Sequence, residues 1–180
     1  MTEDLRHRIV ELLPRLRRFV RVLTGDVDGG DDLVQETCAR ALSRLDQWQP
    51  GTRLDSWMFR IAQTLWLDRL RAAKIRGETV DIDAMHDLAG EDGRQITETR
   101  LTLNRVSEGI AQLPADHQVL IALIIVDGLS YKEAAEILDI PIGTVMSRLA
   151  RARLSLYEFA EGTASDASMK KGQSRRGPSD

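Results

Sequence analysis

The stretch Leu129–Arg153, LSYKEAAEILDIPIGTVMSRLARAR, predicts two short helices joined by a tight turn. Ser130 followed by Glu133 forms a capping box, which opens the first helix. Pro141 ends that helix and can occupy the first turn of the next one. Apolar residues at helical spacing then predict a buried stripe on the second helix, formed by Val145, Leu149, Ala152 and Leu156.

Another face of the second helix carries side chains that can donate hydrogen bonds. They are Thr144, Ser147, Arg148 and Arg151. Small polar side chains and arginines on the second helix of such a pair are what reading of the DNA major groove requires. The stretch therefore predicts a DNA-binding helix-turn-helix.

The rest of the chain indicates an all-α protein. Of its 180 residues 42% are hydrophobic, which suffices for the cores of one or two small domains, and β-branched runs with alternating polarity are almost absent. The longest apolar run, residues 119–126, is far shorter than the roughly 20 residues that cross a membrane. Cys38 is the single cysteine and has no partner for an internal disulfide, which favours a cytoplasmic chain.

Charge is unevenly distributed along the chain. Residues 1–77 carry a net charge of +3, residues 78–103 carry −5, and the whole chain carries −3. A protein that binds DNA unaided usually has a concentrated basic surface. We therefore expect weak intrinsic binding to DNA, with a larger partner supplying most of the affinity.

Hydrophobic spacing predicts a first helical domain over residues 1–77. Helices are expected over residues 4–23, 31–48 and 52–76, with breaks at residues 25–30 and 49–51. Thr52 and Asp55 predict a capping-box-like start for the third of these helices.

A second helical domain is predicted over residues 95–160. The acidic, glycine-containing residues 78–94 before it predict a flexible linker. Helices are expected over residues 96–112 and 114–127, ahead of the helix-turn-helix. Residues 161–180 combine Gly, Ser and Ala with scattered charge, which predicts a disordered tail.

Two runs resemble the extracytoplasmic-function (ECF) sigma factors of the sigma-70 superfamily. Asp31–Arg71, DDLVQETCARALSRLDQWQPGTRLDSWMFRIAQTLWLDRLR, resembles their region 2, and Leu113–Arg153 resembles their region 4. The resemblance implies a bacterial sigma factor that binds core RNA polymerase, recognises −35 and −10 promoter elements, and initiates transcription of a specific stress-response regulon.

The resemblance also implies roles for individual residues. The helix that docks on the β′ clamp helices of the polymerase would use Asp31, Asp32, Gln35 and Glu36. Recognition and melting of the −10 element would use Trp48, Gln49, Thr52, Arg53, Trp57 and Arg60. The DNA backbone would be held by Arg69, Arg71, Lys74 and Arg76, and the −35 element would be read by Thr144, Ser147, Arg148 and Arg151.

Several of these roles have a simpler structural alternative. Trp57 falls on the apolar side of its predicted helix, which favours packing in the core over stacking on a base. The basic residues between 69 and 76 can simply complement a helix dipole, and Asp31 and Asp32 can serve only as helix-start residues.

The implied partners are macromolecules. They are core polymerase through its β′ clamp helices and β flap, promoter DNA, and an anti-sigma factor. No cofactor, metal or small-molecule substrate is expected, because His7, His86 and His117 are dispersed and no catalytic motif is present, so an enzyme is not predicted. Two alternatives stay open: a sigma-like decoy that sequesters an anti-sigma factor, and a stand-alone helix-turn-helix regulator.

Overall fold

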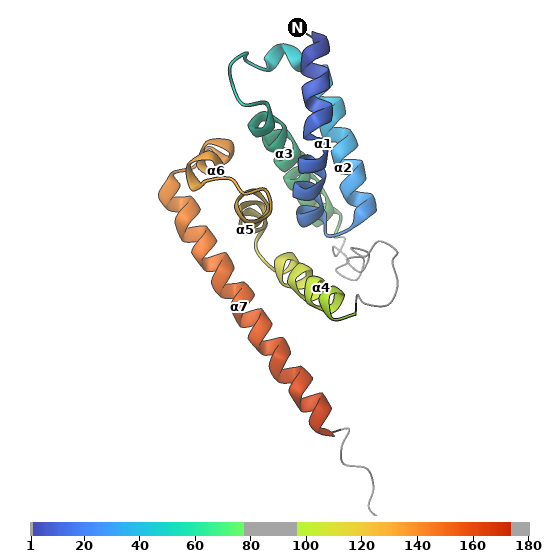
Figure 1. Cartoon of the computed structure of the whole chain (residues 1–180), viewed down its shortest axis with the longest axis vertical. Coiled ribbons are helices and arrows are strands. Elements are labelled where there is room, and N and C mark those ends of the chain that lie inside the picture. Colours follow the sequence, from blue (N-terminus) through green and yellow to red (C-terminus); the bar gives the residue numbers. More distant parts are fainter. Residues whose placement is uncertain (1, 78–96, 174–180) are drawn as a thin grey trace, which may run out of the picture.

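The first half of the chain folds as a bundle of three helices (Figure 1). A computed structural model describes residues 2–77 and 97–173, and their side chains over residues 4–77 and 103–162. The N-terminal bundle consists of α1 (Thr2–Thr24), α2 (Val27–Ser43) and α3 (Leu54–Arg76). Its core includes the rings of Phe19 and Phe59, whose centroids lie 4.9 Å apart.

Helix α2 begins four residues earlier than the sequence suggested. The side chain of Asp26 accepts a hydrogen bond from the backbone N–H of Gly29 and caps the helix. Gly25, with φ 76°, provides the left-handed turn that ends α1, so the predicted six-residue break is much shorter. At its other end α2 stops at Ser43, and a short 3-10 turn, η1 (Leu45–Gln47), follows.

The predicted capping box at the start of α3 is wrong. Helix α3 begins at Leu54, and its N-cap residue Arg53 makes no side-chain capping bond. The Thr52 hydroxyl instead donates to the carbonyl of Gln49, at 2.7 Å. Local bonding of this kind lets a threonine stabilise a turn rather than a helix start.

The second half of the chain forms the C-terminal unit. Its elements are α4 (Thr97–Ala111), α5 (Ala115–Leu120), the π-helical turn η3 (Ile121–Val126), α6 (Tyr131–Leu138) and α7 (Ile142–Gln173). The single helix predicted over residues 114–127 is therefore α-helical at first and π-helical afterwards. At its start the buried side chain of Gln118 donates to the carbonyls of Ala111 and Leu113, which ties α5 to the preceding turn.

The predicted helix-turn-helix is confirmed as α6 and α7. Both hydrogen bonds of the capping box between Ser130 and Glu133 are present. Asp139, with φ 54°, ends α6 in the left-handed conformation. Val145 and Leu149 of α7 are buried against the rest of the unit.

The tail predicted over residues 161–180 is wrong in its first part. Helix α7 continues to Gln173, so residues 161–173 are helical. These residues contain no proline and include several good helix formers, which lets an established helix propagate. Residues 174–180 and the predicted linker 78–94 lie outside the described residues.

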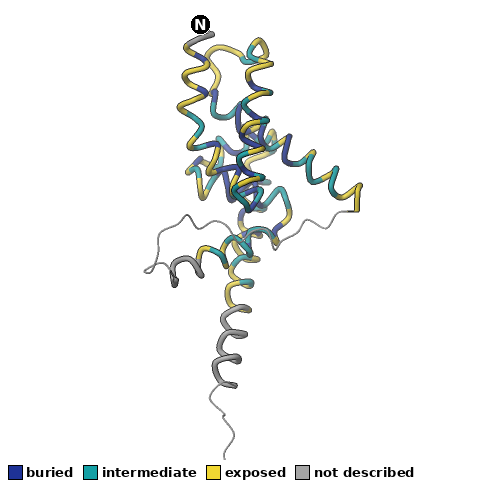
Figure 2. Tube along the Cα trace, turned by 90° about the vertical axis from the view of Figure 1, so that its right-hand side faces the viewer, coloured by how far each residue is buried: buried dark blue, intermediate teal, exposed yellow. Residues whose placement is uncertain are grey.

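The two halves pack against each other. Helix α1 contacts α5 and η3, and α3 contacts α6. Buried segments gather in the middle of the molecule, where these elements meet (Figure 2), and the buried apolar side chains of both halves belong to one cluster. The described residues are helical throughout their regular structure, which confirms the all-α prediction. None of the described helices is both long and apolar enough to cross a membrane.

Candidate nucleic-acid interface

Helix α7 presents a polar face beside the turn of the helix-turn-helix. Ser147 and Arg151 on this face are exposed, and Thr144 and Arg148 are partly buried. The opposite face is buried, so the core fixes the rotation of α7 and the polar face is left outward. The structure therefore brings all four predicted −35 residues together on one side of one helix.

One of these four residues is already engaged within the C-terminal unit. Nε of Arg148 lies 3.1 Å from Oδ2 of Asp116, near the start of α5. The pairing holds the guanidinium group toward α5 and leaves further N–H donors available. Sequence reasoning did not single out Asp116, because nothing in its local pattern distinguishes it from an ordinary helix-start residue.

The loop between α2 and α3 carries the predicted −10 residues. Gln49 and Thr52 are exposed there, and Trp48 is half-buried beneath the guanidinium of Arg8, which lies 5.4 Å from the ring centroid. Trp57 is half-buried and packs against the core, as its position on the apolar side predicted. The Trp48 ring of this loop can stack on an unstacked base, and the exposed polar side chains of the loop can form hydrogen bonds with that base.

Two other predicted −10 residues extend toward the C-terminal unit. Arg53 binds both carboxylate oxygens of Asp55, at 3.1 and 2.7 Å, and also pairs with Glu133 of α6. Arg60 donates to the carbonyl of Ile137 at 2.9 Å and to the carbonyl of Glu136 at 2.8 Å. In this structure the guanidinium groups of Arg53 and Arg60 are thus occupied by α6.

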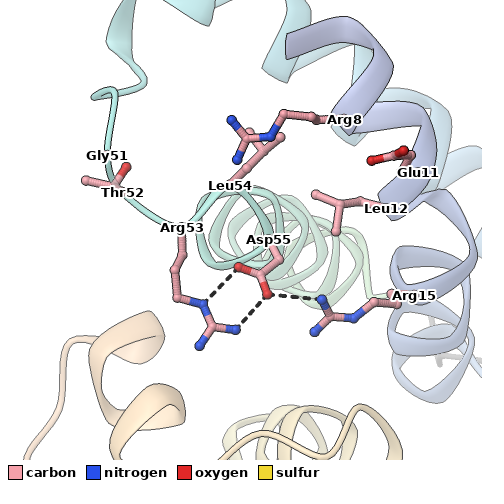
Figure 3. Close-up of a pocket in the computed structure, with 9 residues that line it drawn as sticks. All are labelled: Arg8, Glu11, Leu12, Arg15, Gly51, Thr52, Arg53, Leu54 and Asp55. Carbon is pink, nitrogen blue, oxygen red and sulfur yellow. Dashed lines mark hydrogen bonds and ion pairs between the residues drawn. The ribbon is translucent and has the colours of Figure 1, made fainter. Parts of the chain in front are cut away.

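A third arginine, Arg15 of α1, connects the halves. Nη1 of Arg15 lies 3.1 Å from Oδ2 of Asp55, and Arg15 and Arg53 approach this carboxylate from different elements (Figure 3). Nε and Nη2 of Arg15 also bind the two carboxylate oxygens of Asp127, at 3.0 and 2.6 Å. Beside this group lies a cavity of about 320 Å³, which is lined in part by Arg8 and Thr52.

Ion pairing determines the ionisation of Asp55 and of the two arginines that bind it, Arg15 and Arg53. Burial raises the pKa of Asp55, but hydrogen bonds from Arg53, from the backbone N–H of Ser56 and from Arg15 outweigh burial and lower the pKa to about 2. A hydrogen bond to Asp127 raises the pKa of the Arg15 guanidinium, and one to Asp55 raises that of Arg53. All three side chains are therefore charged near neutral pH.

Replacing Asp55 with asparagine should lower the thermal unfolding midpoint at pH 7, because two guanidinium groups lose a charged acceptor. A loss of about 2 kcal/mol, typical for hydrogen bonds to charged groups, corresponds to roughly 4–8 °C for a chain of this size. Because folding lowers the pKa of the carboxyl, its contribution is complete above about pH 4 and disappears as the pH falls toward 2. Circular dichroism melting curves of the wild type and the variant should therefore converge on acidification.

The matched control is Asp68→Asn. Asp68 pairs with Arg71 on the exposed surface of α3, at 2.8 Å, so its replacement should change the midpoint little at any pH. A difference between the wild type and Asp55→Asn that persisted undiminished at pH 3 would contradict the assigned ionisation.

Comparison with known proteins identifies the family of this chain. Residues 9–63 match the family model described as the Sigma2 domain of PhyR, and residues 103–156 match sigma-70 region 4. The chain is 35% identical over 164 residues to the ECF RNA polymerase sigma factor EcfG of Rhodopseudomonas palustris, covering 90% of this chain and 89% of that protein. The chain belongs to the ECF sigma factors. It is also 35% identical over 156 residues to the ECF RNA polymerase sigma-E factor of Escherichia coli K12, covering 82% and 78% of the two chains.

Solved structures share the fold of this chain. This ECF sigma factor resembles the sigma factor RpoE solved in complex with the anti-sigma factor NepR from Bartonella quintana, with a TM-score of 0.70 and 28% identity. The match covers 88% of this chain and 98% of that one. CnrH, solved in complex with the cytosolic domain of CnrY, shares the fold at a TM-score of 0.65, 23% identity and 90% coverage of both chains.

The polymerase-binding residues predicted for this sigma factor lie together on α2. Asp32 and Gln35 are exposed, while Asp31 lies 3.7 Å from Arg17 through its carboxylate. Glu36 is less free, because it pairs with Arg40 at 3.7 Å and with Arg69 of α3 at 2.8 Å.

The residues predicted to hold the DNA backbone follow α3 toward its end. Arg69 is bound to Glu36 of the polymerase-binding set, Arg71 is bound to Asp68, and Lys74 and Arg76 are exposed. The structure therefore joins two predicted surfaces, α2 and the second half of α3, through the ion pair between Glu36 and Arg69.

Among the described residues, no cluster of three or more histidine, cysteine or acidic side chains could hold a metal ion.

Proposed function

We propose that this sigma factor directs core RNA polymerase to promoters by reading two elements with separate surfaces. The polar face of α7, with Arg148 and Arg151, reads the −35 element as a duplex. The loop between α2 and α3, with Trp48, Gln49 and Thr52, captures an unstacked base of the −10 element. The observation that supports this proposal best is the outward face of α7, which is held in position by the buried stripe of α7 beside the capped helix α6.

Attachment to polymerase compensates for weak binding by the free chain. The net charge of −3 gives this sigma factor little general attraction to DNA. Once α2 attaches the chain to polymerase, both DNA-reading surfaces belong to one complex, and binding of the second promoter element becomes effectively intramolecular. Avidity then replaces intrinsic affinity. Extruding a base costs a few kcal/mol, which contacts in the loop offset, so capture of the base also promotes strand opening. Polymerase carries out the catalysis.

We propose further that this chain acts in the cytoplasm under the control of an anti-sigma factor. The similarity to RpoE, which was solved with its anti-sigma factor NepR, supports such a partner. Affinity capture of the full chain from its native cells should recover a stoichiometric inhibitor that is released when transcription is induced.

Run-off transcription tests the proposed function directly. Bacterial core polymerase would be supplied with a library of promoter fragments, with and without the full chain, and specific transcripts should appear only when the chain is present. An absence of specific transcripts, together with tight capture of an anti-sigma factor, would instead support the decoy. Tight binding to duplex DNA without polymerase would support a stand-alone regulator.

A further inference from the structure

Arg148 differs from the other residues of the polar face of α7, because a second helix holds its charge. Its Nε atom lies 3.1 Å from Oδ2 of Asp116, in the first turn of α5. The Ser147 hydroxyl, by contrast, bonds only within α7, where it donates to the carbonyl of Thr144. Arg151 is exposed and pairs with no carboxylate in the part of the chain that the structure describes. Of the two arginines on this face, Arg148 is thus the one whose charge is already balanced.

Packing fixes Asp116 beside this arginine. Helix α5 contacts α7, and Val119 and Leu120 of α5 are buried. The side chain of Gln118 donates to two carbonyls of the preceding turn, which holds the first turn of α5 in place. The backbone at position 116 is therefore fixed relative to α7, whereas Arg148 has a long side chain with several rotatable bonds. The carboxylate can thus determine where the guanidinium lies.

Stability of the fold does not account for this ion pair. The side chains of Arg148 and Asp116 are 32% and 45% exposed, so water and salt screen their attraction. A carboxylate beside a DNA-binding face also repels the phosphates of the DNA. The pair therefore contributes little to stability and opposes general attraction to DNA. Its effect must lie in the choice between DNA sequences.

A guanidinium that is already paired discriminates among the acceptors that DNA offers. A phosphate is another anionic acceptor, and the nearby carboxylate of Asp116 weakens the attraction of Arg148 for it. A base edge with two adjacent acceptors, such as O6 and N7 of guanine, binds two N–H groups of an arginine at once. The Nη1 and Nη2 atoms of Arg148 have no partner among the described residues, so they are available for such an edge.

We propose that Asp116 is a specificity-determining residue of the −35 reader and acts by positioning Arg148. The inference rests on the proposed function, since it requires that Arg148 contacts DNA bases. While the ion pair is intact, Arg148 adds little to the binding of an arbitrary sequence, and a base edge with two well-placed acceptors engages its remaining N–H groups. Specificity increases when an interaction weakens the wrong complexes as well as when it strengthens the right one.

Asp116→Asn tests this role, because it removes the charge and keeps the size of the side chain. Holoenzyme assembled from core polymerase and the full chain would be titrated with duplexes that carry a −35 element selected with the wild type, each of its single-base variants, or a scrambled element. The variant should bind the scrambled duplex about threefold more tightly. Its discrimination at one base-pair position should fall about fivefold. Loss of folding would weaken binding to every duplex, so this gain and this loss together distinguish positioning from a structural role.

Glu158→Gln is the matched control for charge. Glu158 is exposed on α7, ten positions beyond Arg148, so its replacement removes the same negative charge without changing the ion pair. The control should bind the scrambled duplex slightly more tightly and keep its discrimination at every position. A fall in discrimination as large in Glu158→Gln as in Asp116→Asn would overturn the positioning role, because charge alone would then explain it.

A double-mutant cycle connects the effect to Arg148. In an Arg148→Ala background, Asp116→Asn should no longer change the discrimination, because the guanidinium that it positions is absent. Discrimination that still falls about fivefold in this background, or that does not fall in Asp116→Asn alone, would overturn the inference and leave the promoter-reading role intact. The promoter-reading role fails separately if the wild-type holoenzyme prefers none of the duplexes, and the inference, which depends on that role, then fails with it.

Discussion

Replacing Arg148 and Arg151 together with alanine should greatly reduce promoter-specific initiation by polymerase carrying this sigma factor. Each arginine that reads a base contributes about 1–3 kcal/mol of discrimination, so the double variant should lose roughly 30-fold or more in specific initiation. The fold should survive, because the buried face of α7, with Val145 and Leu149, is unchanged. The measurement is run-off transcription on a promoter selected with the wild-type chain.

The single variants should differ from each other. Arg151 is exposed, whereas Arg148 is tied to Asp116 and must share its donors with DNA or release that carboxylate. We therefore expect Arg151→Ala to account for more of the loss than Arg148→Ala.

Arg153→Ala is the matched control for this experiment. Arg153 is exposed on the same helix, but two residues along an α-helix turn it about 200° away from Arg151. The control removes the same charge from the other side of α7 and should leave initiation nearly unchanged. An equal loss in the control would mean that α7 contributes only general attraction to DNA, and full activity of the double variant would contradict the assigned reading face.

The helix-turn-helix could be predicted because local rules determine it. A capping box and a stripe of apolar residues at helical spacing are visible within 25 residues, and tertiary packing agrees with both. The structure accordingly contains the α6 capping box and the buried face of α7. The polar face of α7 followed from the same periodicity, since the residues off the stripe must point outward.

Helix boundaries were harder to predict, because competing local bonds decide them. Asp26 and Gly29 start α2 inside a glycine-rich segment whose composition suggested a longer break. Thr52 turned its hydroxyl back to Gln49 instead of capping α3. In both places a side chain had two nearby backbone groups available, and only the folded chain shows which one it uses.

Contacts between the halves could not be predicted from the sequence at all. Arg15 and Asp127 are separated by 112 positions, and neither lies in a motif. The resemblance to sigma factors implies a DNA role for Arg60, and an arginine on a helix surface has the same sequence pattern whether it faces a phosphate or the end of another helix. Long-range ion pairs of this kind depend on how the two halves dock, which periodicity and capping do not specify.

Replacing Phe19 with alanine should cause the largest loss of stability in the N-terminal bundle. Phe19 is fully buried, Phe59 is 2% exposed, and their rings meet at 4.9 Å with a 50° tilt. Removing a buried phenylalanine ring costs about 3–5 kcal/mol, and an aromatic pair adds about 0.5–1.5 kcal/mol. Because a whole domain is stable by only about 5–15 kcal/mol, this loss would bring the bundle close to unfolding at 25 °C.

Urea denaturation followed by circular dichroism measures the loss. Val10→Ala, on the same helix but 59% exposed, is the control and should change stability by less than about 0.5 kcal/mol. Phe19→Leu keeps most of the volume and should fall between the two. A change below about 1 kcal/mol for Phe19→Ala would contradict the assignment of this pair as the centre of the bundle.

The same substitution should also weaken the contact between the halves. The guanidinium of Arg15 lies 5.6 Å from the ring centroid of Phe59, and it is this guanidinium that holds Asp127. A ring that loses its partner at Phe19 can shift within the core and carry the guanidinium with it. With spin labels at Ser43→Cys and Ala150→Cys, both exposed positions, in a Cys38→Ser background, the distance between the halves can be measured by double electron–electron resonance. Phe19→Ala should therefore broaden this distance distribution under conditions in which the bundle is still folded, whereas Val10→Ala should leave it narrow. Core packing and the ion-pair contact between the halves would then be two parts of one coupled structure.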